Sequence, residues 1–365
     1  MTAAPVVPDT IDFTDLRKRV DDLLESFFDD KAGLAATRRL PGEVTALLRD
    51  FVLSGGKRLR PLLCTVGWSA AAPDTPPPDF VVRAAASLEL FHAFALIHDD
   101  VMDGTHLRRG SPTVHRAFAD HHAPRRDAVR LGEHCAILAG DLAHVWSDEL
   151  LSTASPPPGA VPAVHRVMDL MRWEVMFGQY LDLLASGPPG PEFETDAAEE
   201  RALQIIRYKT ARYTVEHPLH LGAALAEADP PVYAALSAYA LPIGEAFQLR
   251  DDLLGTFGDP ATTGKPSLDD LREGKGTLLL ALAMRSADAA QRDTLRRLIG
   301  RPDLTERDAR LVRSVLDDTG AHAAVETLIL ARLDQACQAL EQADLPPAAT
   351  AALRTLASAS TRRNT

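Results

Sequence analysis

The sequence is poor in aromatic residues, in cysteine and in net positive charge. Aromatic residues make up 5% of its 365 residues, whereas Ala and Leu are abundant, which favours helices over sheets built from β-branched and aromatic residues. The three cysteines, Cys64, Cys135 and Cys337, are far apart and form no CxxC pair. Their spacing therefore indicates neither a zinc site nor a disulfide framework.

The charge and the apolar runs exclude further classes of protein. A net charge of −12 argues against a nucleic-acid-binding surface. No apolar run approaching the roughly 18 residues of a membrane span is evident, and the N-terminal MTAAPVVPDTIDF lacks the basic and apolar regions of a secretory signal. We therefore expect a cytoplasmic protein without a transmembrane segment, in which any local group of Arg and Lys residues is informative.

Three proline-rich stretches, residues 71–79, 155–162 and 187–193, interrupt an otherwise helical pattern. Proline lacks an N–H group and clashes with the preceding turn, so these stretches are predicted to be loops between helices. Composition does not change across them. The sequence therefore predicts an all-α protein with one domain at 11–356, a bundle of about ten or more helices around a central apolar cavity. We expect a disordered N-terminus at 1–10 and a frayed C-terminus at 357–365.

The apolar stretch VVRAAASLELFHAFALI ends in the acidic segment HDDVMD, residues 98–103. Residues four apart on a helix lie on one face, about one turn from each other, so the carboxylates of Asp99 and Asp103 form a site for a hard cation. Mg²⁺ takes one or two carboxylates and completes its shell with water and phosphate oxygens. The alternative is an acidic helix end that is merely solvated.

A second acidic segment, FQLRDD at 247–252, also follows a long apolar run and lies about 150 residues after the first. Two such segments in matching contexts predict facing metal sites. The residues that follow contribute Lys265 and Lys275, cations that could close over an anionic ligand.

Several cationic segments accompany the acidic ones. Gly55 and Gly56 precede three cations within four residues, Lys57, Arg58 and Arg60, a pattern that favours a multiply charged phosphate. The other polar candidates are Arg108 with Arg109, Lys209 with Thr210, and Gln179 with Asp182. Solvated surface, or salt bridges to the nearby aspartates, is the alternative for each of them.

Taken in order, these segments resemble the trans-isoprenyl diphosphate synthase family, also called polyprenyl synthetases. The resemblance covers about residues 53–280 and rests on GGKRLRP, LIHDDVMDGTHLRRGSPTVH, AGDLA, GQYLDL, YKTARYT, FQLRDDLLGTFGDP and GKPSLDDLREGKGTLL. It implies a Mg²⁺-dependent prenyltransferase that joins isopentenyl diphosphate to an allylic diphosphate. It also implies a homodimer.

The resemblance assigns roles to individual residues. Three Mg²⁺ ions are expected, with Asp99, Asp103 and Asp251 as direct ligands. Asp100, Asp252 and Gln248 would support them. The allylic diphosphate would contact Arg108, Lys209 and Lys265. Isopentenyl diphosphate would be held by Gly56, Lys57, Arg60, His92 and Arg109. Thr210, Gln179 and Asp182 would line the site.

One position departs from the family pattern. The second motif commonly closes with an Asp three residues after its second Asp, where this chain has Gly255. We keep the third metal site, because its expected direct ligand is Asp251. Asp259 could substitute for the missing carboxylate if the helix continues that far.

Product length is predicted from residues that precede the first motif. Residues four, five and eight positions before Asp99 are Ala95, Phe94 and Phe91, and on a helix Phe94 and Phe91 would lie roughly 7 and 12 Å below the metals. Two phenylalanines would block a deep channel. The pattern resembles synthases that make geranylgeranyl diphosphate, with farnesyl diphosphate as the alternative. All three residues could instead be ordinary core.

Other functions remain open at this stage. A class I terpene cyclase would use the same ionisation but needs no isopentenyl diphosphate site, and a non-catalytic synthase subunit would have eroded Asp motifs. The pair His121-His122 could bind a metal, but a surface loop is the favoured interpretation.

Overall fold

The computed structural model describes residues 11–73, 75–108, 110–258 and 268–361, with side chains up to residue 357. The all-α class is confirmed, because the described strands, β1 (Leu107–Arg108) and β2 (Ser111–Pro112), form only a short antiparallel hairpin. By its contacts the chain divides into two compact units. Each unit is described by itself below.

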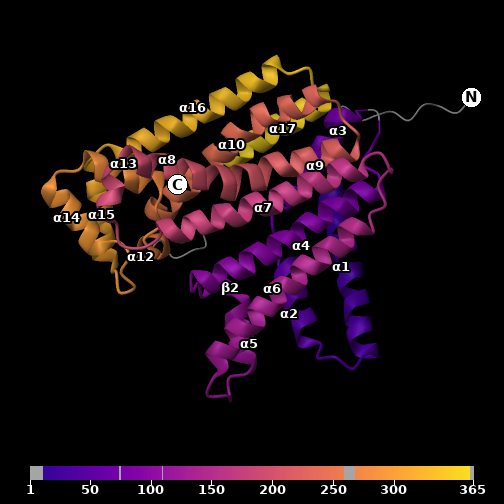
Figure 1. Ribbon diagram of the computed structural model, residues 1–365, viewed down its shortest axis with the longest axis horizontal. Helices are drawn as coiled ribbons and strands as arrows, with labels where there is room; N and C mark the ends of the chain where they lie inside the picture. The colour runs from indigo at the N-terminus through magenta and orange to yellow at the C-terminus, as the bar shows by residue number, and fades with distance from the viewer. Residues whose placement is uncertain (1–10, 74, 109, 259–267, 362–365) are drawn as a thin grey trace, which may run out of the picture. The chain divides into compact units, whose positions relative to one another are not determined.

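The first unit comprises Met1–Val164, Pro218–Ala228 and Pro346–Ala349. Its helices are α1 (Phe13–Thr37), α2 (Glu43–Leu53), α3 (Leu59–Ala71), α4 (Asp79–Met102), α5 (Val114–His121), α6 (Ala128–Ser152) and most of α9 (His217–Leu225). Helix α4 is central and packs along α6, as Figure 1 shows. The shared face is rich in fully buried alanines, whose short side chains let the two helices approach closely.

Helix α4 is long and apolar enough to cross a membrane by length and composition, which corrects the expectation that no such stretch exists. However, 72% of its most apolar window is buried inside the protein. The core helix of a soluble protein meets the same criterion. The buried side chains of α4, including Leu90, Phe91 and Ile97, form the core of the first unit.

The second unit comprises His165–His217, Asp229–Leu345 and Thr350–Thr365. Its elements are most of α7 (Val161–Ala185), η1 (Pro191–Glu194), α8 (Asp196–Ile205), η2 (Ile206–Glu216), α10 (Pro230–Phe257), α12 (Asp269–Glu273), α13 (Leu278–Ser286), α14 (Ala289–Leu298), α15 (Glu306–Asp318), α16 (Ala321–Gln342) and most of α17 (Pro347–Thr361). Helix α10 packs against η2 and α16. A core that includes Leu249, Met284 and Val325 joins these helices.

Two features of the second unit differ from a plain helical bundle. Segment η2 is a π-helix of 11 residues, a form that is rare and frequent at functional sites. Helix α17 continues to Thr361, beyond residue 356 where fraying is expected, because Leu356 and Ala357 are buried. The three proline-rich stretches lie largely outside the α-helices, as predicted. Helix α3 ends at Ala71 and α4 begins at Asp79, and most of residues 155–162 and 187–193 likewise lie between α-helices.

Candidate active site

The first acidic motif ends α4 in the first unit. Helix α4 ends at Met102, and Asp103 caps it by donating its backbone N–H to the carbonyl of Asp99 at 2.9 Å. This hydrogen bond keeps helical spacing between Asp99 and Asp103, as the sequence predicts. Both residues are half-buried, so their carboxylates remain accessible to a cation and its water.

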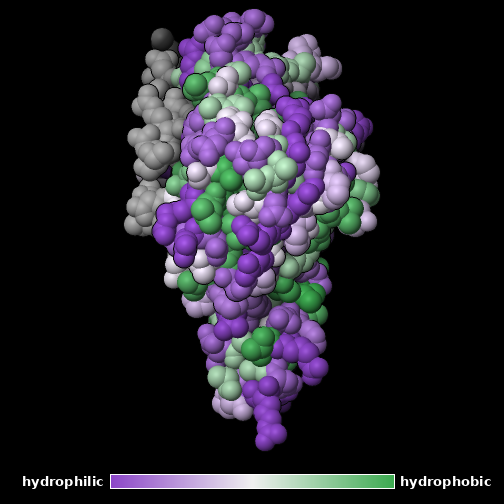
Figure 2. Space-filling model, turned by 90° about the vertical axis from the view of Figure 1, so that its left-hand side faces the viewer, coloured by the Kyte–Doolittle hydropathy of each residue, from purple (hydrophilic) through white to green (hydrophobic). Residues whose placement is uncertain are grey.

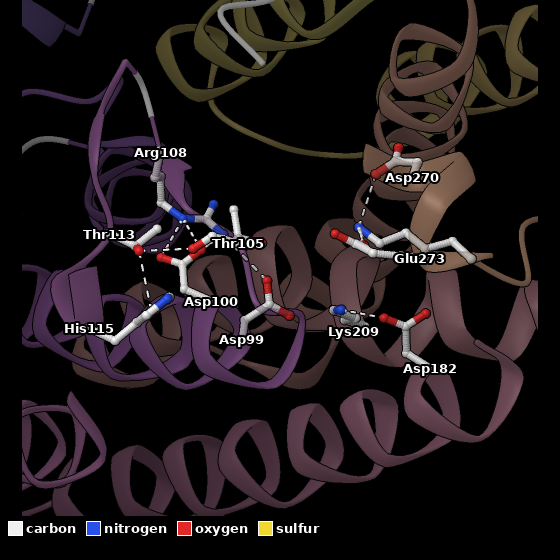
Figure 3. A network of polar contacts seen from close by, with 11 residues as sticks. Asp99, Asp100, Thr105, Arg108, Thr113, His115, Asp182, Lys209, Asp270 and Glu273 are labelled. Atoms are coloured by element: carbon white, nitrogen blue, oxygen red, sulfur yellow. Dashed lines mark hydrogen bonds and ion pairs between the residues drawn. The ribbon is translucent and has the colours of Figure 1, made fainter. Parts of the chain in front are cut away.

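The middle carboxylate of this motif is held by the β1–β2 hairpin. Arg108 donates through Nε to both oxygens of Asp100 at 2.9 Å and through Nη2 to Oδ1 at 2.6 Å, and it lies 3.5 Å from Asp99 Oδ2 (Figure 3). Asp100 is only 1% exposed. Burial alone would lower the pKa of Arg108, but the hydrogen bonds and charge of Asp100, with the charge of Asp99, raise it. The guanidinium therefore stays charged beside the carboxylates of the first acidic motif.

The glycine-rich loop that precedes α3 is held by one of the three cations that the sequence predicts to favour a phosphate. Gly55 and Gly56 have φ angles of +101° and +149°, which side-chain-bearing residues rarely adopt. The next turn is anchored by buried Arg58, which donates to Glu89 and Asp21, each at 2.8 Å, and to the backbone carbonyl of residue 52 at 2.9 Å. Only the structure separates this anchoring arginine from its neighbours.

The residues of this unit that are predicted to bind isopentenyl diphosphate differ in their exposure to solvent. Lys57 is exposed, whereas Arg60 and His92 are half-buried. A cavity between α2, the hairpin and α5 is lined by Asp50, Ser54, Arg108, Ser111 and other residues. The start of the glycine-rich loop and Arg108 therefore border the same cavity.

The second acidic motif ends α10 in the second unit and is tied to the π-helix. Thr210 donates its hydroxyl to Gln248 Oε1 at 2.6 Å, and Gln248 Nε2 donates to Asp252 Oδ1 at 2.8 Å. Lys209, also in η2, forms an ion pair with Asp182 of α7 (Figure 3). The structure thus brings together residues predicted from three separate sequence segments.

The carboxylate of Asp270, from α12, lies directly beside Gly255, where the motif commonly has an Asp. A Cβ atom added at Gly255 would lie 1.8 Å from Asp270 Oδ2, so a larger residue at 255 has no room while Asp270 is there. Lys275 Nζ lies 3.1 Å from Asp270 and 3.3 Å from Glu273. Asp270 has no predicted role, because no pattern in the sequence shows that α12 packs against α10.

The electrostatics of this cluster favour a bound cation. Desolvation raises the pKa of Asp252 to about 7, despite the hydrogen bond from Gln248, and the negative charges of Asp270 and Asp251 add to the rise. A divalent cation relieves such crowding of carboxylates.

Three predicted residues lie outside the described residues: Arg109, Lys265 and Asp259. The proposed substitution by Asp259 required α10 to continue, but α10 ends at Phe257 with Gly258 as its extended C-cap. The condition for that expectation is therefore not met.

The predicted product-length residues lie on α4. Phe91 and Phe94 are 0% and 7% exposed, and their rings lie 5.3 Å apart and 5.5 and 5.1 Å from the ring of His144 on α6. Ala95 is half-buried. Their role in product length stays a prediction.

A model of one protein family, described as polyprenyl synthetase, matches residues 42–316, about three quarters of the chain. The chain belongs to the polyprenyl synthetase family. The predicted family is thereby confirmed, and membership makes the protein a prenyltransferase.

Known relatives of this polyprenyl synthetase span several product lengths. A short chain isoprenyl diphosphate synthase of Methanocaldococcus jannaschii is 33% identical over 73% of this chain and 74% of its own. A (2E,6E)-farnesyl diphosphate synthase of Mycobacterium tuberculosis is 36% identical over 74% of this chain and 63% of its own.

The fold is also found in solved structures. The geranylgeranyl pyrophosphate synthase of Corynebacterium glutamicum, solved with isoprenyl diphosphate and magnesium, is 40% identical. It has a TM-score of 0.90 and the match covers 97% of this chain and all of that one.

Proposed function

We propose that this polyprenyl synthetase catalyses the Mg²⁺-dependent head-to-tail condensation of isopentenyl diphosphate with allylic diphosphates and releases a short all-trans prenyl diphosphate, geranylgeranyl diphosphate. Farnesyl diphosphate is the second candidate product. The observation that carries the proposal is that each unit places a cation beside carboxylates near its acidic helix end. In the first unit Arg108 contacts Asp99 and Asp100 at the end of α4. In the second unit Lys209 contacts Asp182 of α7, and the neighbouring Thr210 is linked through Gln248 to Asp252.

The carboxylate sets fit Mg²⁺, which prefers oxygen ligands. In the first unit Asp99 and Asp103 would hold two ions, and in the second unit Asp251 would hold one, giving the three ions implied by family resemblance. When bound, Mg²⁺ supplies positive charge that stabilises the departing diphosphate. Burial is the main cause of the raised pKa of Asp252, and the negative charges of Asp270 and Asp251 add to it. A cation in the second unit would relieve both effects.

The protein's own residues contribute binding, orientation and exclusion of water. Arg108 and Lys209 carry fixed positive charge for diphosphate oxygens, which stabilises the negative charge that develops as the allylic C–O bond breaks. Lys57 and Arg60 would hold isopentenyl diphosphate. The apolar side chains of α4 behind Asp99 shield the allylic cation from water. The alkene then attacks C1, and the proton it loses goes to the released diphosphate.

Asp270 completes the second motif in this proposal. Its carboxylate lies where the side chain of a residue larger than Gly255 would be, and Lys275 keeps it oriented. Asp270 would therefore accept a hydrogen bond from metal-bound water, in place of an Asp at position 255. Removing a residue that orients metal ligands typically lowers metal affinity or activity by about 10–100-fold.

The proposal includes a cytoplasmic homodimer. Helix α7 exposes the large apolar side chains of Trp173, Phe177, Tyr180 and Leu184, each at least 51% exposed. A second copy would bury such a row, because soluble monomers rarely leave large apolar patches in water. Light scattering coupled to size exclusion would test the dimer, and a monomeric mass at micromolar concentration would contradict it.

The deciding experiment incubates the protein with Mg²⁺, isopentenyl diphosphate and, in separate reactions, dimethylallyl, geranyl and farnesyl diphosphate. Products are dephosphorylated and their chain length is measured. A 20-carbon alcohol from any primer supports the proposal, and a 15-carbon end product favours the second candidate. No condensation with any primer would overturn it, and a cyclic hydrocarbon would identify a terpene cyclase.

A further inference from the structure

Two histidines and a glutamate converge in the first unit, in a group that shares no residue with the acidic motifs. His121 lies in the last turn of α5, His122 is its C-cap, and Glu43 begins α2. His121 Nε2 lies 3.0 Å from Glu43 Oε2, and His122 Nε2 lies 3.6 Å from Glu43 Oε1. The predicted surface loop is corrected in one respect, because His121 is the last residue of α5.

The spacing of these ligand atoms suits a metal ion. One atom from each residue can be chosen so that all three lie within 4.8 Å of one another. Zn²⁺ binds imidazole nitrogen and carboxylate oxygen at about 2.0–2.2 Å in a tetrahedral arrangement, which places neighbouring ligand atoms about 3.3–3.5 Å apart. The two separations, 3.0 and 3.6 Å, are close to that value but end on different oxygens of Glu43, so the carboxylate would bind the ion through one or both of its oxygens. Small rotations of the side chains would close the site.

Helix dipoles explain only part of the arrangement. A carboxylate at the start of α2 and an imidazolium at the end of α5 are each favourable for their own helix. They do not explain why two imidazole rings, 5.0 Å apart and nearly perpendicular, approach one carboxylate. Two nitrogen donors and one oxygen donor select a borderline metal such as Zn²⁺ over Mg²⁺, which prefers oxygen ligands alone.

We propose that Glu43, His121 and His122 form a binding site for Zn²⁺ or a similar divalent transition metal, which ties the start of α2 to the end of α5. The side chains are 30%, 58% and 27% exposed, so an ion enters directly from solvent and a water completes its shell. In Figure 2, the part of the first unit at the bottom of the view, where Figure 1 places α5, is covered mostly by hydrophilic residues.

The site would brace the helices that carry substrate-binding elements at their other ends. Helix α2 leads at Leu53 into the glycine-rich loop, and α5 begins at Val114 directly after the hairpin of Arg108. A metal that joins the opposite ends stabilises the cavity between α2, the hairpin and α5.

The test measures zinc binding without substrates, so its result does not depend on the proposed prenyl transfer. The full chain is stripped with chelator and returned to excess Mg²⁺, which occupies the carboxylate sites. Zn²⁺ is then titrated against a chromogenic chelator, and the Tm is recorded with and without the metal. We expect one tight equivalent per chain and a rise in Tm, because a ligand that binds only the folded state stabilises it.

Single-residue variants test which side chains bind the metal. His121→Asn and His122→Asn should each weaken Zn²⁺ binding by more than the roughly 10–100-fold that removal of an outer-shell partner causes, and should abolish the rise in Tm. His134→Asn changes an exposed histidine on α6 outside the group. It should leave the Zn²⁺ affinity and the rise in Tm unchanged. Failure to bind Zn²⁺ in excess Mg²⁺, or binding that survives the His121→Asn/His122→Asn double variant, would overturn the proposal.

Discussion

The two acidic helix ends look alike in sequence but are supported differently. At the end of α4, Asp100 is held by Arg108, eight residues later in the chain, on a hairpin that follows directly. At the end of α10, Gln248 and Asp252 depend on Thr210, 38 residues before Gln248, and Asp270 approaches from α12 beyond the helix end. One carboxylate motif is therefore positioned by local chain geometry and the other by tertiary packing.

Removing the expected direct ligand from either motif should have the largest effect. Asp99→Asn and Asp251→Asn keep the side-chain shape but remove the charge that binds the metal. We expect kcat to fall by about 10²–10³-fold in each, as when one preorganised stabilising group is lost from an active site. Incorporation of labelled isopentenyl diphosphate measures the rate. Equal losses would show that both ends serve one reaction, whereas near-normal activity of Asp251→Asn would remove the second motif from the metal set.

An exchange of residues tests whether Asp270 replaces the missing motif residue. Gly255→Asp alone should lower activity by about 10–100-fold, because its side chain collides with the Asp270 carboxylate. Asp270→Gly alone should cause a similar loss. The double variant Gly255→Asp/Asp270→Gly restores one carboxylate and should recover most of the activity. Additive losses in the double variant would contradict this, since they would mean that the two positions act separately.

In protein stripped of metal by a chelator, loss of the second Asp of each motif should change the free energy of unfolding by different amounts. Asp100→Asn leaves the Arg108 guanidinium, 15% exposed, without its carboxylate and should lower the free energy of unfolding by about 3–5 kcal/mol. Asp252→Asn should leave the free energy of unfolding at neutral pH unchanged or raise it, because the raised pKa means that burial disfavours the ionised carboxylate in the folded chain. Denaturant unfolding of both variants checks the ranking.

The raised pKa of Asp252 also predicts how the free energy of unfolding changes with pH. The pKa of Asp252 is raised to about 7 in the folded chain and lies near 3.9 when unfolded, so the folded state retains a proton that the unfolded state loses. The free energy of unfolding of the metal-free protein should therefore fall as pH rises from about 4 to 7. Asp252→Asn should flatten this decline, and an unchanged slope would show that another group causes it.

The same contrast explains which parts of the fold and of the candidate site could be predicted from the sequence. The all-helical class, the loops and the first motif follow from local patterns, because a helix fixes the spacing of Asp99 and Asp103. The partners of the second motif could not be derived in the same way. Neither the π-helix that presents Lys209 nor the approach of Asp270 to Gly255 leaves a local pattern, since both depend on how distant helices pack. The anchoring role of Arg58 likewise requires the positions of α1 and α4.

The smallest expected effect is a change of product without loss of chemistry. Phe94 packs against Phe91, His98 and His144, behind Asp99. Phe94→Ala opens space in this part of the first unit, so we expect longer prenyl products at comparable turnover. Phe118→Ala, which removes an equally buried ring from α5, should destabilise the fold by a similar roughly 3–5 kcal/mol but leave product length unchanged. Chain-length analysis of both variants separates the two effects. If Phe94→Ala makes the same product as the unmodified chain, Phe94 is a core residue and product length is set elsewhere.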